Sequence, residues 1–312
     1  MEYQVMTDGT FLIKSLVWSL EDELDKQAVT IHQVPDYSVL AEKFSDSKQN
    51  AEAMSVYLNL GNVLFSTGRT VEARESYFIG LALAEQNKCK WFVSAFQSNI
   101  GHLNYSEGNL EEAITYFNLA LPGLKEGSEH KDNTPVLLGI ILKMESIYNQ
   151  KKELDRAIEC LQQALILFKN TDGKIGTARC LNNLGLIHVA TKNHDQALNN
   201  FREALAIFRE LGSREDEAQQ LGNLGSVYRD ISKHDLALKH YNESLAVFKE
   251  LGNELGVANE LGNIGYILFM KGDYNSALTY FLQAEKLYLK LGVASRAEMT
   301  RKNIDNLLDK II

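Results

Sequence analysis

Proline, cysteine and tryptophan are scarce in this chain, whose 312 residues include three prolines, three cysteines and two tryptophans. Because proline interrupts helices, its scarcity leaves room for long unbroken ones. Cys89, Cys160 and Cys180 lie far apart, which favours reduced thiols packed in helices over disulfide bridges. Long apolar runs are also missing, and none approaches the length that spans a membrane.

Positive charge is in deficit as well. The chain has 32 Lys and Arg against 41 Asp and Glu, a formal net charge of −9. This balance argues against general binding to nucleic acid or to anionic membranes. The N-terminus lacks the layout of a secretory signal, so we expect a cytoplasmic protein.

The sequence signatures of catalysis are missing too. There is no phosphate loop, no dinucleotide glycine fingerprint and no Gly-x-Ser-x-Gly elbow. The seven histidines are scattered, and His194 and His234 are too far apart in the sequence to share a metal ion. We therefore expect no enzyme, no metal site and no cofactor.

A glycine that returns every forty residues is the dominant feature that is present. The positions are Gly61, Gly101, Gly185, Gly225 and Gly265, with Glu145 in the third place and a spacing of forty-four before it. Twelve residues after each position comes an alanine, and four further on a large apolar residue. Three beyond that stands a small one. A fixed period of this length predicts a stack of similar supersecondary units.

Each unit has the pattern of two helices. In the fifth unit, apolar residues recur at three- and four-residue steps over 216–229 and again over 234–251. A short polar turn at 230–233 separates them. The continuous period therefore predicts one elongated array of helix pairs, although the length alone could hold two domains.

Small residues in each unit predict where its two helices approach each other. We expect the first glycine to face the later alanine across the helix pair, and the aromatic residue to fill the gap toward the next unit. Gly68, Gly108 and Gly272 stand in the turns, where a left-handed conformation ends a helix.

The sixth unit carries the resemblance to a known family. Its Asn263-Ile264-Gly265, Gly272-Asp273-Tyr274, Ala277, Phe281 and Ala284 resemble the tetratricopeptide repeat in a long, forty-residue form. Leu-Gly-Asn tripeptides at 60–62, 221–223, 251–253 and 261–263 are similar to those of the Pins-type Leu-Gly-Asn adaptors, and the long repeat resembles kinesin light chains and microbial relatives.

This resemblance implies an all-α fold, a right-handed superhelical α-solenoid of about six helix-turn-helix units over residues 51–293. It also implies a non-enzymatic scaffold that binds a protein or peptide partner in a concave groove lined by the first helices. Residues 1–50 are expected to form a helical cap or a degenerate repeat, and residues 294–312 a capping helix that shields the last unit from water.

The third unit departs from the others. It has a four-residue insertion between Lys125 and Pro135, and Glu145 stands where the other units have glycine. Two interpretations remain open: drift in a tolerant loop, or a kink that alters the curvature or opens a contact surface.

An asparagine stands two residues before the glycine in five of the six units and before the equivalent residue of the last helix. These ladder asparagines are Asn59, Asn99, Asn183, Asn223, Asn263 and Asn303, and Lys143 takes the place in the third unit. Asparagine is a mediocre helix former, so its recurrence needs a reason. In the family this position faces the groove, and an amide can pair with both the N–H and the C=O of a peptide backbone. The alternative is that these side chains bond to the adjacent repeat and lock the stack.

The candidate peptide-binding residues are Asn59, Asn62, Asn99, His102, Lys143, Arg179, Asn183, Asn223, Arg229, Asn263 and Tyr266. Aromatic residues are expected near the two ends of the groove, namely Phe65, Tyr105, Tyr266 and Phe269. Lys143, Arg179 and Arg229, with Lys302 on the cap, outnumber Asp230 on this stripe, which suggests an acidic segment or a C-terminal carboxylate as the partner.

Two other functions are compatible with the sequence. One is a peptide-sensing regulator similar to the Rap-type family, in which residues 1–50 would deliver the output. The other is a structural protein whose end repeats stack between molecules. Polar caps favour a monomer, with self-association as the alternative.

Overall fold

The structure is a computed structural model that describes residues 50–126, 133–171 and 173–311. The predicted N-terminal cap or degenerate repeat therefore lies outside the described residues, apart from Asn50. The chain divides into two compact units, Met1–Cys160 and Leu161–Ile312. The described residues of both are almost entirely helical and contain no strand.

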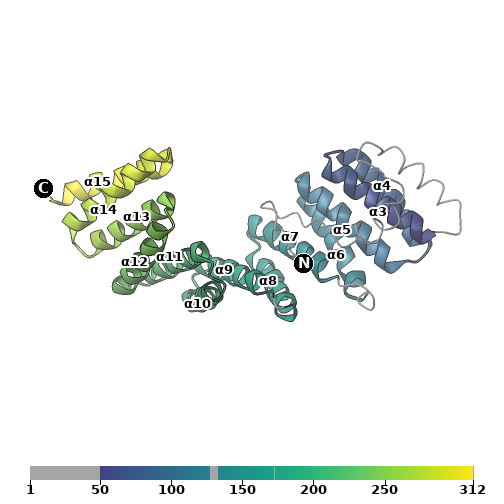
Figure 1. Cartoon of the computed structure of the whole chain (residues 1–312), viewed down its shortest axis with the longest axis horizontal. Helices are drawn as coiled ribbons and strands as arrows, with labels where there is room; N and C mark the ends of the chain where they lie inside the picture. Colours follow the sequence, from purple (N-terminus) through teal and green to yellow (C-terminus); the bar gives the residue numbers. More distant parts are fainter. Residues whose placement is uncertain (1–49, 127–132, 172, 312) are drawn as a thin grey trace. The chain divides into compact units, whose positions relative to one another are not determined.

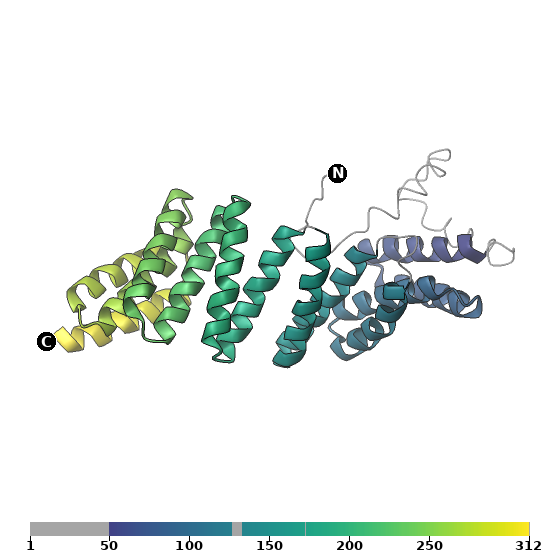
Figure 2. The same ribbon diagram turned by 90° about the horizontal axis from the view of Figure 1, so that it is seen from below.

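In the first unit the helices are α3 (Asn50–Ser66), α4 (Thr70–Gln86), α5 (Lys90–Ser106), α6 (Leu110–Glu126), α7 (Thr134–Gln150) and the start of α8 (Leu154–Asn170). The second unit holds the rest of α8 and α9 (Lys174–Ala190), α10 (His194–Glu210), α11 (Arg214–Asp230), α12 (His234–Glu250), α13 (Glu254–Met270), α14 (Tyr274–Lys290) and α15 (Ala294–Ile311). From α3 to α7 and from α9 to α15, each helix packs beside the next one in the chain, and neighbours run antiparallel (Figures 1 and 2).

Uniform lengths explain the forty-residue period. In the second unit the helices α9 to α14 are all 17 residues long, and three residues separate each from the next. Seven residues separate α6 from α7, which places the insertion of the third repeat between these two helices.

The turns end their helices as the glycines predict. Gly68, Gly108 and Gly272 have φ values of 79°, 82° and 82°. Where glycine is absent the same conformation is still required, and Ser232 adopts it with a φ of 58°. The N–H of Lys233 then donates to the carbonyl of Tyr228 at 2.8 Å, which satisfies one of the last carbonyls of α11.

Each repeating glycine lies against the aromatic residue of its own helix pair, and this corrects the predicted packing. A Cβ added at Gly185 would lie 2.4 Å from Cε1 of Phe201, and one at Gly225 would lie 2.7 Å from Cδ1 of Tyr241. Both rings are fully buried. The ring therefore occupies the space beside the glycine within the pair, where alanine was expected.

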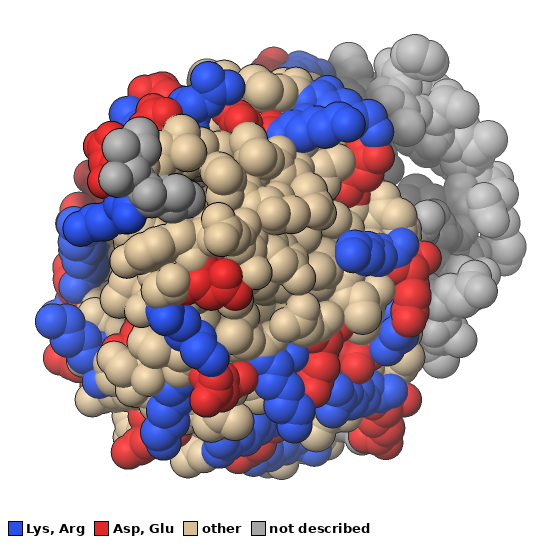
Figure 3. All heavy atoms as spheres, turned by 90° about the vertical axis from the view of Figure 1, so that its left-hand side faces the viewer, with Lys and Arg blue, Asp and Glu red and all other residues tan. Residues whose placement is uncertain are grey.

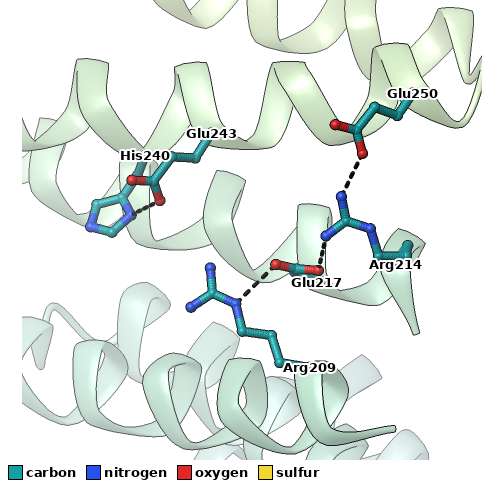
Figure 4. Close-up of polar contacts among 6 residues, drawn as sticks. All are labelled: Arg209, Arg214, Glu217, His240, Glu243 and Glu250. Carbon is teal, nitrogen blue, oxygen red and sulfur yellow. Dashed lines mark hydrogen bonds and ion pairs between the residues drawn. The ribbon is translucent and has the colours of Figure 1, made fainter. Parts of the chain in front are cut away.

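A chain of ion pairs joins three consecutive helices of the second unit (Figure 4). Glu217 of α11 accepts from Nε of Arg209 on α10 at 2.9 Å and from Nη1 of Arg214 at 2.5 Å. Arg214 also donates to Glu250 of α12 at 2.6 Å. Burial by itself raises the pKa of Glu217, but the two arginines outweigh it, so that pKa lies below its usual value.

The last helix differs from the first helices that precede it. In α13 the positions held by Ala258, Leu261 and Gly265 are buried. Forty residues on, α15 has exposed Glu298, Arg301 and Asp305. Seen from the end of the second unit that carries the C-terminus, uncharged residues occupy the middle of the face and most charged side chains surround it (Figure 3). The predicted role of α15 as a cap is consistent with this exchange of apolar for charged residues, and it remains a prediction.

Candidate functional site

In the first unit, side chains of α3 and α5 meet at an amide pair. Asn99 Nδ2 donates to Asn62 Oδ1 at 2.9 Å. The hydroxyl of Tyr77, from α4, donates to the same oxygen at 2.8 Å. Both asparagines are half-buried. The Asn62 carbonyl oxygen is thus taken up by the protein, and its amide N–H groups have no recorded partner in the described residues.

Next to this pair lies a group of side chains from α5 and α7. Lys143 Nζ stands 4.4 Å from the centre of the Tyr105 ring, and the Tyr105 hydroxyl is 3.3 Å from Ser146 Oγ. The His102 ring packs edge-on against Phe117 at 5.0 Å. Burial and the charge of Lys143 lower the pKa of His102 to about 3, so this imidazole is neutral at pH 7.

In the second unit, Asn182 of α9 is the centre of a polar cluster. Its Oδ1 accepts from Gln220 Nε2 at 2.9 Å and from Asn223 Nδ2 at 3.1 Å, both on α11. Its own Nδ2 donates to Asn183 Oδ1 at 3.2 Å. Two ladder asparagines are therefore joined through one side chain that is not itself in the ladder.

On α13 the ladder asparagine is bonded to a buried carboxyl. Asn263 Nδ2 donates to Glu260 Oε2 at 3.2 Å, and Ser244 of α12 donates to Oε1 at 3.1 Å. A Cβ added at Gly222 would lie 2.6 Å from Oε1, so this glycine leaves room for the carboxyl. Burial raises the pKa of Glu260 to about 7 against the opposing effect of the two hydrogen bonds.

The charged candidates are not all free to meet a ligand. Arg229 donates through Nε and Nη2 to Asp230 Oδ1, at 3.0 and 2.8 Å, and Lys302 pairs with Glu298 at 2.8 Å. Lys143 and Arg179 make no ion pair within the described ranges. The expected basic character of the face therefore depends on Lys143 in the first unit and Arg179 in the second.

The other candidates are placed without partners of their own. Asn59 on α3 and Asn303 on α15 are half-buried and have no hydrogen bond recorded in the described part of the chain. Tyr266, on α13, is 40% exposed, so its ring is open to solvent.

Three polar residues bonded to the ladder asparagines, directly or, for Gln220, through Asn182, have no counterpart among the sequence-predicted candidates: Asn182, Gln220 and Glu260. Gln220 and Glu260 stand five residues before the repeating glycine, where the second and third units have Phe96 and Ile140. Both are buried, at 2% and 5% exposure. A polar residue at a position that is apolar in other units is the signal that could have revealed them.

The described residues hold no group of three His, Cys, Asp or Glu side chains placed to bind a metal ion, and Cys89, Cys160 and Cys180 are all free thiols. Nor does any described helix have the length and apolar character needed to cross a membrane.

Comparison with known proteins agrees with the fold. The tetratricopeptide repeat family matches residues 138–210 and 216–290 and residues 96–121, together more than half of the chain. The chain therefore belongs to the tetratricopeptide repeat family, and its helical array is an α-solenoid of that class. No curated protein matches the sequence.

Several solved structures share the architecture. BtubC (BKLC) from P. vanneervenii is 22% identical with a TM-score of 0.57, over 73% of this chain and 91% of that chain. Aspartyl phosphate phosphatase F from Bacillus subtilis is 15% identical with a TM-score of 0.61, over 99% and 85%. The apo form of RapI is 15% identical with a TM-score of 0.53, over 83% and 98%. At these identities the likeness concerns the fold alone.

Proposed function

We propose that this protein is a non-enzymatic scaffold that binds an extended segment of a partner protein along its first helices. The observation that carries the proposal is the row of half-buried amide side chains on consecutive first helices, with Asn183 and Asn223 both bonded to Asn182. An amide whose bonding capacity is only partly used can pair with the backbone of an extended chain whatever its side chains are. The membership in a repeat family of stacked helix pairs supports the same role.

The locking role considered from the sequence is compatible with this proposal. Asn99 and Asn223 each bond to a first helix of the preceding repeat, so these side chains help to join neighbouring units. Each bond uses one N–H of the amide. The Oδ1 of both side chains has no recorded partner in the described residues and is left for a ligand.

Charge in the first unit favours a neutral or acidic segment. Between Lys90 and Ser106, α5 has no Asp or Glu, and the one carboxylate of α7 is Glu145. Glu145 is buried, and burial raises its pKa. Lys143 therefore faces no exposed carboxylate from its own helix or from α5.

The test replaces two ladder asparagines of the second unit. A peptide is first selected from a random display library on the wild-type protein, and its affinity is measured by fluorescence polarisation. We expect Asn183→Ala combined with Asn223→Ala to abolish binding and to leave the helical circular dichroism spectrum intact, because both side chains are half-buried and neither is a core residue.

A matched control changes two asparagines on the second helices. Asn199 and Asn242 are exposed, and their double replacement by alanine should leave the affinity unchanged. Unchanged affinity of the ladder variant, or failure of any library peptide to bind the wild type, would show that the first helices are not the binding surface.

A further inference from the structure

Three ladder asparagines have the same side-chain orientation, with one amide N–H bonded to an acceptor of the protein. Asn99, Asn223 and Asn263 each donate one N–H to an acceptor of the protein, at 2.9, 3.1 and 3.2 Å. A side-chain amide can turn over and exchange its oxygen for its nitrogen, so an unbonded one presents either group. In these three side chains, the N–H bonded to the protein fixes the orientation, so that Oδ1 points away from the acceptor.

The acceptors come from different places in the repeat. Asn62 follows the glycine of the preceding repeat by one residue, and Asn182 stands three residues before the glycine of its repeat. Glu260 stands five residues before the glycine, on the same helix as Asn263. The common orientation of the amides is therefore produced by acceptors at three different positions of the repeat.

Each acceptor is itself held by a second donor. The Tyr77 hydroxyl donates to Asn62 Oδ1, Gln220 to Asn182 Oδ1 and Ser244 to Glu260. Tyr77, Gln220 and Ser244 are all buried, at 1%, 2% and 0% exposure. If the acceptor turned away, the buried donors Tyr77 and Gln220 would be left unsatisfied, which costs free energy and keeps the acceptor oxygen in place. The hydroxyl of Ser244 is shared with the carbonyl of Ala218, 2.9 Å away, so Ser244 stays satisfied without Glu260.

Asn183 has the opposite orientation. Its Oδ1 accepts from Asn182 Nδ2, so its two N–H groups remain available. On α11 and α13 the available atoms are the Oδ1 of Asn223 and of Asn263. The second unit thus presents amide donors on α9 and amide acceptors on α11 and α13.

We infer that Asn62, Asn182 and Glu260 are positioning residues that fix the orientation of the ladder amides and thereby set which backbone groups of a bound segment each helix receives. A segment along the second unit offers a carbonyl to Asn183 and N–H groups to Asn223 and Asn263. This inference rests on the proposed function, since it assigns which helices of the same surface present hydrogen-bond donors and which present acceptors.

Glu260 gives the cleanest test because it is 5% exposed and so lies below the surface that a ligand would touch. Glu260→Leu removes the acceptor of Asn263, while Glu260→Gln keeps a carbonyl oxygen that can accept from Asn263 and an amide that can donate to Ser244. The first readout needs no ligand and is hydrogen exchange of the Asn263 side-chain amide, followed by NMR. We expect faster exchange in Glu260→Leu and wild-type exchange in Glu260→Gln; unchanged exchange in Glu260→Leu would overturn the inference.

The second readout is the affinity of a library peptide selected on the wild-type protein. Glu260→Leu should weaken binding by about tenfold, the equivalent of about 1.4 kcal/mol, and Glu260→Gln should not. In an Asn263→Ala background, Glu260→Leu should have no further effect, because it acts only through Asn263.

The possible outcomes separate the two proposals. If no peptide binds, or if Asn263→Ala leaves the selected peptide unaffected, the ladder is not the binding surface at α13 and the proposed function fails there. If Asn263→Ala weakens binding but Glu260→Leu does not, or if Glu260→Leu weakens it equally in both backgrounds, the positioning role is wrong.

Discussion

At the scale of single residues, the repeating glycine is explained by one neighbour. Glycine in a helix interior costs about 1 kcal/mol relative to alanine, so its return at one position in five repeats needs a reason that offsets this cost. The ring of Phe201 occupies the space beside Gly185. In the third repeat both partners differ, since Glu145 takes the glycine position and Leu161 the aromatic one.

This packing predicts opposite effects of two glycine replacements in first helices of the second unit. Gly185→Ala should lower the free energy of unfolding by about 1–3 kcal/mol, because the buried Phe201 ring must move. Gly262→Ala should raise it by roughly 0.5–1 kcal/mol, because the nearest atom to its Cβ would be Tyr288 Oη at 3.9 Å. Urea unfolding of both variants measures the difference, and equal effects would argue against the ring as the cause.

At the scale of helices, two buried carboxyls of the second unit behave in opposite ways. Glu217 is bonded to Arg209 and Arg214, and its pKa is lowered. Glu260 is bonded to the neutral Asn263 and Ser244, with no cation bonded to it in the described residues. Burial outweighs these two hydrogen bonds and raises its pKa to about 7. The first carboxyl fastens three helices by charge, and the second joins α12 to α13 by neutral hydrogen bonds.

The raised pKa of Glu260 predicts how stability changes with pH. A folded-state pKa of about 7 against an ordinary 4.5 means that the contribution of this group is complete below about pH 4.5 and is lost as the pH rises through about 7. At about 1.4 kcal/mol per pKa unit, the loss is at most about 3 kcal/mol. Glu260→Gln should remove this loss.

Urea unfolding at about pH 5.5 and about pH 8 tests the prediction. The advantage of Glu260→Gln over the wild type should grow with pH. The exposed Glu203 offers a control, since Glu203→Gln should follow the wild type at both values. Parallel behaviour of Glu260→Gln and the wild type would show that the carboxyl is not buried as described.

At the scale of the whole molecule, the charges of α15 distinguish it from the first helices before it. Every first helix of the second unit before it buries Ala, Leu and Gly against its partner helix, as Ala218, Leu221 and Gly225 do in α11. In α15 the equivalent residues are charged and exposed, and Arg301 turns back to bond Glu285 of α14 at 2.5 Å. Charged groups at these positions oppose the docking of another helix against this side of α15.

Replacing those charges should therefore allow α15 to associate with other molecules of the protein. We expect the combined variant Glu298→Ala, Arg301→Leu and Asp305→Gly to associate as its concentration rises, and the wild type to remain monomeric. Light scattering across a concentration series measures both. Lys286→Leu, at an exposed position of α14, controls for a general increase in apolar surface, and association of the wild type would contradict the capping role.

The periodic sequence by itself determined the class of fold, the pairing of helices, the left-handed turns at Gly68, Gly108 and Gly272, and the candidate face at the ladder positions. These depend on local conformation and on which side of a helix a residue occupies, and both are set by spacing along the chain. Only the tertiary structure decided that an aromatic ring lies against each repeating glycine, that Arg229 is paired with Asp230, and that Asn182 and Glu260 hold the ladder amides. Such contacts depend on side-chain rotamers and on distances between helices forty residues apart, which the periodicity of one helix does not specify.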